Sequence, residues 1–439
     1  MKIFLLTSLI FFSSVTPALA TSPDLQFPQG FLWGASTAAH QVEGGNTNQW
    51  SVWEQQNADR LARTAPDRYK NLISWPSIKD QATDPANYIS GAADDEYNRY
   101  DEDFDLLQQL SLNSYRFSLE WSRIEPKQGE FDEQAIEHYK EELTDLKKRG
   151  ITPFVTIYHW TEPVWFSDLG GWEHSKSPEF FNQFVEKVAA ELGDQVTYWA
   201  TLNEPNGYAA NSYLVGKWPP NAHNPFAYLL VTSSLIKAHK LAYTTLKQQN
   251  PKAQVGIAQS MSDVEAVNNS WLNRLIKGVI DDNSNYYFLN QIEDYQDYIG
   301  VNYYRHIRAD WALSKSTPAK VSDMGWELYP QGIYDVLIGV KKYNKPIYIT
   351  ESGLADASDT NRAWYIQQTL SSVHQAIGDG ADVRGYFHWS LLDNFEWAEG
   401  FWPRFGLVAV DRSNNLKRTI RPSAFSYASI AKNNTLPQP

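Results

Sequence analysis

Two glutamates in this sequence stand directly after strongly apolar segments. Glu204 follows the segment 198–203, and Glu351 follows the segment 347–350. A carboxylate at such a position is costly to remove from water unless it is paired. Taken alone, either glutamate could therefore equally be one half of a structural ion pair or a catalytic group. Two carboxyl groups that face each other, however, are what cleavage of a glycosidic bond requires: one attacks the sugar or activates water, and the other protonates the departing oxygen.

The neighbours of the two glutamates suggest how the roles divide. Asn203 precedes Glu204 and offers an amide that can hold a sugar hydroxyl, while Pro205 fixes the chain as it leaves the segment. Arg116 lies in another apolar segment, and a close arginine lowers the pKa of a carboxyl group by roughly 1 to 3. A carboxylate beside Arg116 would therefore stay ionised and suit the part of nucleophile.

The elements that must position these residues follow a repeating pattern of a short β-rich run, a loop and an amphipathic segment. This alternation is typical of parallel strands joined by helical crossovers, and several runs are apolar on both faces, as strands covered on both sides are. The predicted strands are 31–37, 113–119, 152–159, 196–203, 254–259, 298–304, 346–350 and 383–389. Between them, apolar residues recur with a period of 3.6, most clearly in the stripe that contains Phe181, Phe184 and Val188.

Eight such pairs predict an α/β fold, a single (β/α)₈ TIM barrel with long βα loops. The longest loops are 44–96, 260–296 and 305–329, and each follows a predicted strand. No repeat or linker divides the chain, so we predict one catalytic domain over residues 21–439. A doubly wound open sheet is the alternative, but its G-x-G-x-x-G marker is missing. In a barrel, Glu204 and Glu351 would end strands four and seven and face each other across the mouth.

Seven motifs make a resemblance specific, and they occupy residues 31–44, 115–118, 159–160, 203–205, 302–304, 349–353 and 389–397. Together, and in this order, they resemble the motifs of glycoside hydrolase family 1, the β-glucosidase family. The resemblance extends from about Phe27 to Tyr427. One tripeptide such as Asn-Glu-Pro would be weak support, whereas seven ordered matches with barrel-like spacing are specific.

The resemblance implies a retaining mechanism through a glycosyl-enzyme intermediate, with Glu204 as acid/base and Glu351 as nucleophile. It implies substrate-binding roles for Gln41, His159, Asn203, Tyr304, Trp389, Glu396 and Trp397. Supporting roles fall to Arg116, Asn302 and Phe405. Amides, imidazole and carboxylates bind hydroxyls directionally, and indole faces cover the C–H side of a sugar ring, so the residue types agree with these roles. No metal and no organic cofactor is needed.

The predicted activity is hydrolysis of terminal non-reducing β-D-glucosyl residues from a small-molecule or oligosaccharide β-glycoside. A β-galactosidase, a β-fucosidase or mixed specificity is the first alternative, because the same side chains could bind an axial hydroxyl. Net sugar transfer to an acceptor and a sugar-binding protein without turnover are further alternatives. The sequence departs from the family pattern at Ser352, at Thr161–Pro163 and at Asn206, which makes the leaving-group preference the least transferable property.

Composition narrows the classes of partner. The formal net charge of −13 disfavours nucleic acid, and the absence of cysteine excludes disulfides, thiolate nucleophiles and Cys-ligated metals. The 17 Trp, 25 Tyr and 20 Phe residues are a surplus that suits either core packing or sugar stacking.

The N-terminus has the pattern of a secretory signal peptide over residues 1–20. Lys2 supplies a positive charge, residues 3–12 form an apolar run, and Ala18–Ala20 form a small-residue cleavage site. The apolar run is shorter than the roughly 20 residues of a spanning helix. We therefore predict export to the periplasm or the medium, with cleavage near Ala20 and no membrane span afterwards.

Overall fold

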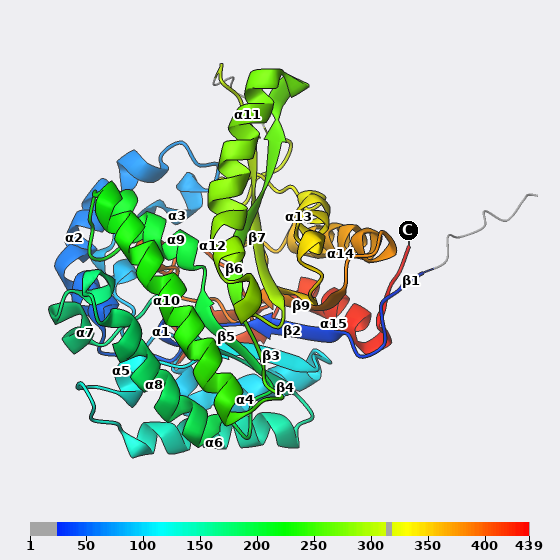
Figure 1. Ribbon diagram of the computed structural model, residues 1–439. Helices are drawn as coiled ribbons and strands as arrows, with labels where there is room; N and C mark the ends of the chain where they lie inside the picture. The colour runs from blue at the N-terminus through cyan, green and yellow to red at the C-terminus, as the bar shows by residue number, and fades with distance from the viewer. Residues whose placement is uncertain (1–23, 313–317, 439) are drawn as a thin grey trace, which may run out of the picture.

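The computed structural model describes residues 24–312 and 318–438. Eight parallel strands form a closed barrel, and helices cover its outer surface (Figure 1). The (β/α)₈ prediction is therefore confirmed. The signal peptide predicted for residues 1–20 lies outside the described residues.

The barrel strands follow one another around the barrel in chain order, and β2 closes it by pairing with β9. They are β2 (Leu32–Ser36), β3 (Ser114–Ser118), β4 (Thr152–Tyr158), β5 (Tyr198–Asn203), β6 (Gln254–Ala266), β7 (Ile299–Ala309), β8 (Ile347–Ser352) and β9 (Val383–Trp389). Two small antiparallel ladders lie outside the barrel, β1 (Leu25–Gln26) with β12 (Thr435–Leu436) and β10 (Val408–Asp411) with β11 (Lys417–Ile420).

Most of the longer helices bury one apolar face, whereas α11 leaves Trp271, Leu275 and Val279 exposed. In α8, Phe181, Phe184 and Val188 are buried, as the 3.6-residue period predicts. The α-helices are α1 (Ala39–Val42), α2 (Gln49–Tyr69), α3 (Trp75–Ala82), α4 (Glu96–Gln109), α5 (Trp121–Ile124), α6 (Glu133–Lys148), α7 (Val164–Asp168), α8 (Ser177–Leu192), α9 (Pro205–Ala209), α10 (Pro225–Gln249), α11 (Trp271–Ile280), α12 (Tyr287–Gln291), α13 (Gly332–Val340), α14 (Arg362–Gly378) and α15 (Pro422–Asn433). Within the described ranges, none of the helices is both long and apolar enough to cross a bilayer.

Two strands are longer than their sequence pattern predicts. β6 continues past Gln259 to Ala266, and β7 continues past Tyr304 to Ala309, with the two extensions paired in parallel. Figure 1 shows these extensions rising out of the barrel together with α11. The loops expected at 260–296 and 305–329 therefore begin as strand, because pairing between the two extensions satisfies backbone groups that a loop would leave to water.

β-Bulges interrupt the barrel ladder near the carboxyl ends of β5, β7 and β8. Between β7 and β8 the register moves from Val301–Ile349 to Asn302–Glu351, which leaves Thr350 as the extra residue. Between β6 and β7 it moves from Met261–Tyr303 to Ser262–Arg305, which leaves Tyr304 as the extra residue. A bulge breaks the strict alternation of side chains and re-aims the residues beside it. These bulges lie next to both glutamates singled out in the sequence.

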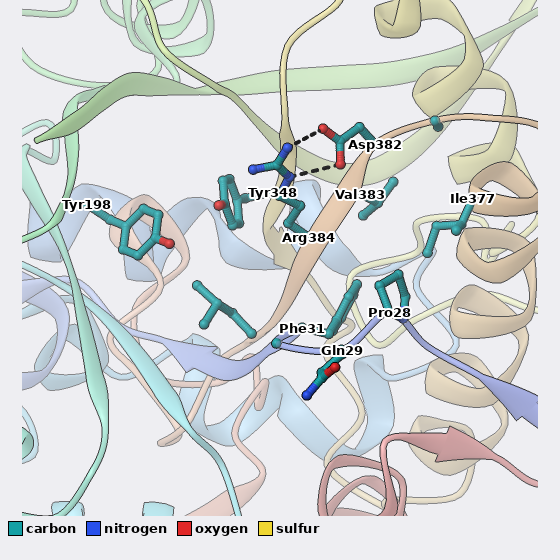
Figure 2. A pocket seen from close by; sticks show the side chains of 12 residues that line it. Pro28, Gln29, Phe31, Tyr198, Tyr348, Ile377, Asp382, Val383 and Arg384 are labelled. Atoms are coloured by element: carbon teal, nitrogen blue, oxygen red, sulfur yellow. Dashed lines mark hydrogen bonds and ion pairs between the residues drawn. The ribbon is translucent and has the colours of Figure 1, made fainter. Parts of the chain in front are cut away.

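The amino ends of the strands form the opposite end of the barrel. A hollow of about 420 Å³ lies there, and Arg384 and Asp382, which form an ion pair at 2.7 Å, line it. Figure 2 shows this pair together with other lining residues, among them Phe31, Tyr198 and Tyr348. A separate cluster of buried side chains, Phe154, Ala200, Tyr298, Tyr348 and Phe387, packs beside this hollow. Four of these five side chains are aromatic, and they fill the interior of the barrel at its amino end.

Candidate active site

A cavity of about 240 Å³ opens at the carboxyl ends of the strands, and most of the residues predicted from the sequence line it. These are Gln41, His159, Glu204, Tyr304, Glu351, Trp389, Glu396, Trp397 and Phe405. Arg116, Asn203 and Asn302 do not line the cavity; they are fully buried and contact the two glutamates or their hydrogen-bond partners. All the site residues predicted from the sequence therefore come together in space.

Two contacts fix the side chain of Glu351 at the end of β8. Its Oε1 accepts a hydrogen bond from Arg116 Nη1 at 2.5 Å, and its Oε2 accepts one from the Tyr304 hydroxyl at 2.8 Å. Arg116 is 0% exposed and also donates to the Thr350 carbonyl and to Thr156. A buried arginine with fixed partners cannot turn away from Glu351, so the ion pair holds the two side chains together.

Glu204 lies at the junction between β5 and α9, where Pro205 is the first helical residue. Its φ of 40° is in the left-handed region, which costs a residue with a side chain of order 1–3 kcal/mol. Glu204 Oε1 accepts a hydrogen bond from Asn302 Nδ2 at 3.0 Å. Burial, and then the negative charge of Glu351, raise the pKa of Glu204 to about 8. At neutral pH the group therefore holds a proton, which it can give up.

A hydrogen-bond network beneath the cavity connects the two carboxyl groups. Asn203 Oδ1 accepts from Arg116 Nη2 at 2.7 Å and from Asn302 Nδ2 at 3.1 Å, and the same Asn302 amide donates to Glu204. Arg116 in turn contacts Glu351. Because Arg116, Asn203 and Asn302 each contact two other members of the network, the positions of the two glutamates depend on each other.

Asn203 also fixes the state of His159. Its Nδ2 atom donates to His159 Nε2 at 3.0 Å, which leaves the ring proton on Nδ1. Burial, and then the charge of Arg116, hold the pKa of His159 well below its usual value. The His159 Nδ1 atom is buried, and no described residue accepts its proton. It is thus a donor available to a ligand.

Gln41 and Glu396 supply further polar atoms. Gln41 Nε2 donates to the Phe395 carbonyl at 2.7 Å, and its Oε1 is buried with no donor among residues 24–312 and 318–438. Burial raises the pKa of Glu396 to about 8, although Asn394 donates a hydrogen bond to it at 2.8 Å. The cavity therefore presents both acceptors and donors of a kind that match sugar hydroxyls.

Aromatic rings form the walls of the cavity. The His159 ring stacks against Trp389 and Trp397, with centroids 6.0 and 6.1 Å apart, and all three side chains line the cavity. Phe405 lies 6.4 Å from Tyr304 in an edge-on arrangement. The many aromatic residues of the sequence therefore have two roles. Phe181 and Phe184 pack in the core, whereas the rings named above face the cavity.

Several residues of the cavity were not assigned a role from the sequence. They are Trp160, Asn211, Lys217, Trp218, Ser260, Arg305, Met324, Trp326 and Glu399. Trp326 and Arg305 lie in the segment predicted as a loop at 305–329. That segment follows a predicted strand, and this position was the one sign in the sequence that it could reach the cavity. Lys217 and Glu399 form an ion pair at 2.7 Å between segments far apart in the chain, which no local pattern reveals.

The positions that depart from the family pattern lie around the cavity and do not line it. Ser352 is buried, and no described residue is a partner of its hydroxyl. Asn206 donates to the carbonyls of Ser260 and Ser284, and Ser260 lines the cavity. As for a metal, no group of three or more His, Cys, Asp or Glu side chains in the described part of the chain is arranged to hold one.

The family model for glycosyl hydrolase family 1 matches residues 24–290 and 272–436, and so spans the barrel and both glutamates. The chain belongs to this family. The family prediction made from the seven motifs is confirmed, and so is the prediction of an enzyme that hydrolyses O-glycosyl bonds.

Relatives within glycosyl hydrolase family 1 cover nearly the whole chain. β-Glucosidase A of Thermotoga maritima is 32% identical, with 94% of this chain and 99% of the relative aligned. A β-galactosidase of Sulfolobus acidocaldarius is 31% identical over 94% of this chain and 96% of its own. The solved β-glycosidase from Pyrococcus horikoshii superimposes with a TM-score of 0.82 at 36% identity, covering 94% and 96% of the two chains.

The hydrogen bond from Tyr304 to Glu351 can be tested in this family 1 enzyme with the variant Tyr304→Phe. Hydrogen bonds to charged groups are worth about 1.5–3 kcal/mol, so we expect kcat/KM for an aryl β-glycoside to fall by about 10- to 100-fold. Steady-state kinetics measure it.

The neighbouring Tyr303 supplies a matched control. Its hydroxyl donates to the Tyr329 carbonyl at 2.6 Å, and the residue does not line the cavity. Tyr303→Phe should keep kcat/KM within a few-fold of the unmodified enzyme. Equal activities of the two variants would show that the Tyr304 hydroxyl does not support Glu351.

Proposed function

We propose that the protein is a retaining β-glucosidase, with Glu351 as nucleophile and Glu204 as acid/base. One observation carries the assignment: the two carboxyl groups share a cavity but have different partners. Glu351 accepts hydrogen bonds from Arg116 and Tyr304, whereas Glu204 contacts an amide, and burial raises the pKa of Glu204 to about 8. Environments that hold two carboxyl groups in opposite states mark the acid and the nucleophile of such a pair.

The reaction proceeds in two displacements. In the first, a Glu351 oxygen attacks the anomeric carbon, the bond to the leaving oxygen breaks, and Glu204 transfers its proton to that oxygen. In the second, the Glu204 carboxylate takes a proton from water, the water oxygen attacks the anomeric carbon, and the bond to Glu351 breaks. The sugar leaves with its original configuration, and Glu204 is again protonated. Retaining pairs of this kind lie about 5–5.5 Å apart.

The sugar would bind through two polar atoms that have no partner among the described residues, Gln41 Oε1 and His159 Nδ1, and through Glu396. Gln41 Oε1 accepts from a hydroxyl, His159 Nδ1 donates to one, and Glu396, protonated at neutral pH, does either. Trp389 and Trp397 would cover the apolar face of the ring, as indole rings do in sugar sites. Binding of this kind fixes the anomeric carbon next to Glu351.

β-Galactosidase or mixed specificity is the second candidate. The similarity to a β-galactosidase of Sulfolobus acidocaldarius supports it, as does the fact that the same polar atoms can meet an axial hydroxyl. Net transfer of the sugar to an acceptor alcohol would use the same intermediate as hydrolysis. We also propose that the enzyme acts outside the cytoplasm, on the strength of the pattern from Lys2 to Ala20.

Initial rates on the nitrophenyl β-glycosides of glucose, galactose, fucose and mannose test the proposed substrate. We expect the highest kcat/KM on the glucoside. Glu351→Ala should reduce the rate on every substrate to the uncatalysed background, because no nucleophile remains. If kcat/KM is higher on the galactoside, the preferred sugar is galactose and not glucose. If Glu351→Ala and the unmodified enzyme release sugar equally slowly, Glu351 is not the nucleophile.

The raised pKa of Glu204 predicts the alkaline limit of activity. Below about pH 8 the group is protonated and can assist the leaving oxygen; above it the proton is lost, and kcat/KM for an alkyl β-glucoside should fall about tenfold per pH unit. A dinitrophenyl β-glucoside, whose leaving group needs no proton, should show a much weaker decline.

Glu396 has a pKa of about 8 as well, so Glu396→Gln is the necessary control. The amide cannot titrate, and we expect the alkaline decline to persist in this variant at lower overall activity. If the decline disappears in Glu396→Gln, the proton on Glu396, and not the one on Glu204, sets the alkaline limit.

A further inference from the structure

Arg305 lines the cavity as a result of the bulge in β7. It follows Tyr304 directly, and neighbours in a regular strand point to opposite faces. Because Tyr304 is the extra residue of the bulge, both side chains line the cavity. Arg305 is exposed, whereas Gln41 and His159 are buried. Arg305 therefore stands at the outer part of the cavity, where the leaving group of a bound glycoside lies.

The Arg305 guanidinium has a ring beneath it and no counter-charge. Its central carbon lies 5.1 Å from the centroid of the Trp326 ring, and no described residue accepts a hydrogen bond from it or forms an ion pair with it. The protein around the guanidinium removes part of its water, which lowers the pKa of Arg305, and no carboxylate opposes this effect. An arginine over an indole ring is partly desolvated and keeps its donors free for a ligand.

The other cations of the site are paired. Arg116 is bound to Glu351 and Lys217 to Glu399, each through one short contact. Glu204 and Glu396 hold protons at neutral pH. Among the described residues at the cavity, Arg305 is therefore the positive charge that nothing balances, on a chain whose formal net charge is −13.

We propose that Arg305 selects β-glycosides whose leaving group carries a carboxylate. The planar guanidinium fork matches the two oxygens of a carboxylate, and the Trp326 ring beside it offers a surface for the body of the leaving group. The proposal rests on the proposed function, because it assigns the outer part of the same cavity to the leaving group. It specifies a substrate class, since neutral and acidic glycosides of the same sugar would be distinguished by Arg305 alone.

The test compares two substrates that differ in charge at one position, 4-carboxyphenyl β-D-glucoside and its 4-carboxamidophenyl analogue. For the unmodified enzyme and for Arg305→Gln, kcat/KM is measured by sugar release, and the ratio of the two substrates is compared between enzymes. We expect Arg305→Gln to lower kcat/KM for the carboxylate about tenfold, mainly through KM, and to change the carboxamide less than about twofold. Comparing ratios cancels the difference in leaving-group reactivity.

Two further variants act as controls. Arg305→Lys keeps the charge without the planar fork and should restore part of the preference. Arg384→Gln removes an exposed arginine at the opposite end of the barrel (Figure 2) and should leave both substrates unchanged. High salt screens exposed charges, so 0.5 M NaCl should reduce the preference of the unmodified enzyme as well.

Two results would overturn the proposal. If Arg305→Gln lowers kcat/KM equally for both substrates, Arg305 only holds the Trp326 ring in place and does not recognise the carboxylate. If kcat/KM falls for neither substrate, Arg305 does not bind the leaving group. The same aglycone pair on β-galactose separates this outcome from failure of the proposed function. If only galactosides are hydrolysed, glucose is the wrong sugar, and the ratio on the galactoside pair still decides the role of Arg305.

Discussion

The ion pair between Arg116 and Glu351 is the contact on which the rest of the site depends. Arg116 is completely buried, and a buried charge is tolerated only where its partners are fixed. Its other donors go to Thr156, the Thr350 carbonyl and Asn203, so that one side chain connects β3, β4, β5 and β8. Burial, and then the charge of Glu351, raise the pKa of Glu204, whereas the charge of Arg116 lowers it. Burial and the neighbouring Glu351 thus keep the proton on Glu204, while Arg116 fixes the position of Glu351.

The barrel supplies the geometry that this electrostatic arrangement needs. Parallel strands end at one rim, so residues that are far apart in the chain, such as Arg116 and Glu351, meet there. A regular ladder alone would not aim them all inward. The bulges at β5, β7 and β8, together with the left-handed φ of Glu204, turn the side chains toward one cavity. The site therefore uses local departures from ideal strand geometry, within a fold that is otherwise regular.

Much of the fold could be predicted from the sequence, because apolar runs and 3.6-residue stripes directly reflect burial in a barrel. The identity of both glutamates followed from their position after such runs, and the remaining site residues followed from the family resemblance. Three features could not be predicted. The lengths of β6 and β7 depend on pairing between them, the bulge at Tyr304 depends on register, and the isolation of Arg305 depends on which acids fold near it. Each is a property of tertiary contacts, which a one-dimensional pattern does not contain.

The most direct test of Glu351 as the nucleophile is to trap the intermediate with an activated 2-deoxy-2-fluoro β-glucoside. The fluorine slows both displacements, and a good leaving group restores the first, so the sugar remains bound to the nucleophile. Mass spectrometry of the digested enzyme should then find one fluoroglucosyl group on the peptide that contains Glu351, and the label should be absent from Glu351→Ala. A label on Glu204, or turnover that gives inverted product without any label, would contradict the assignment.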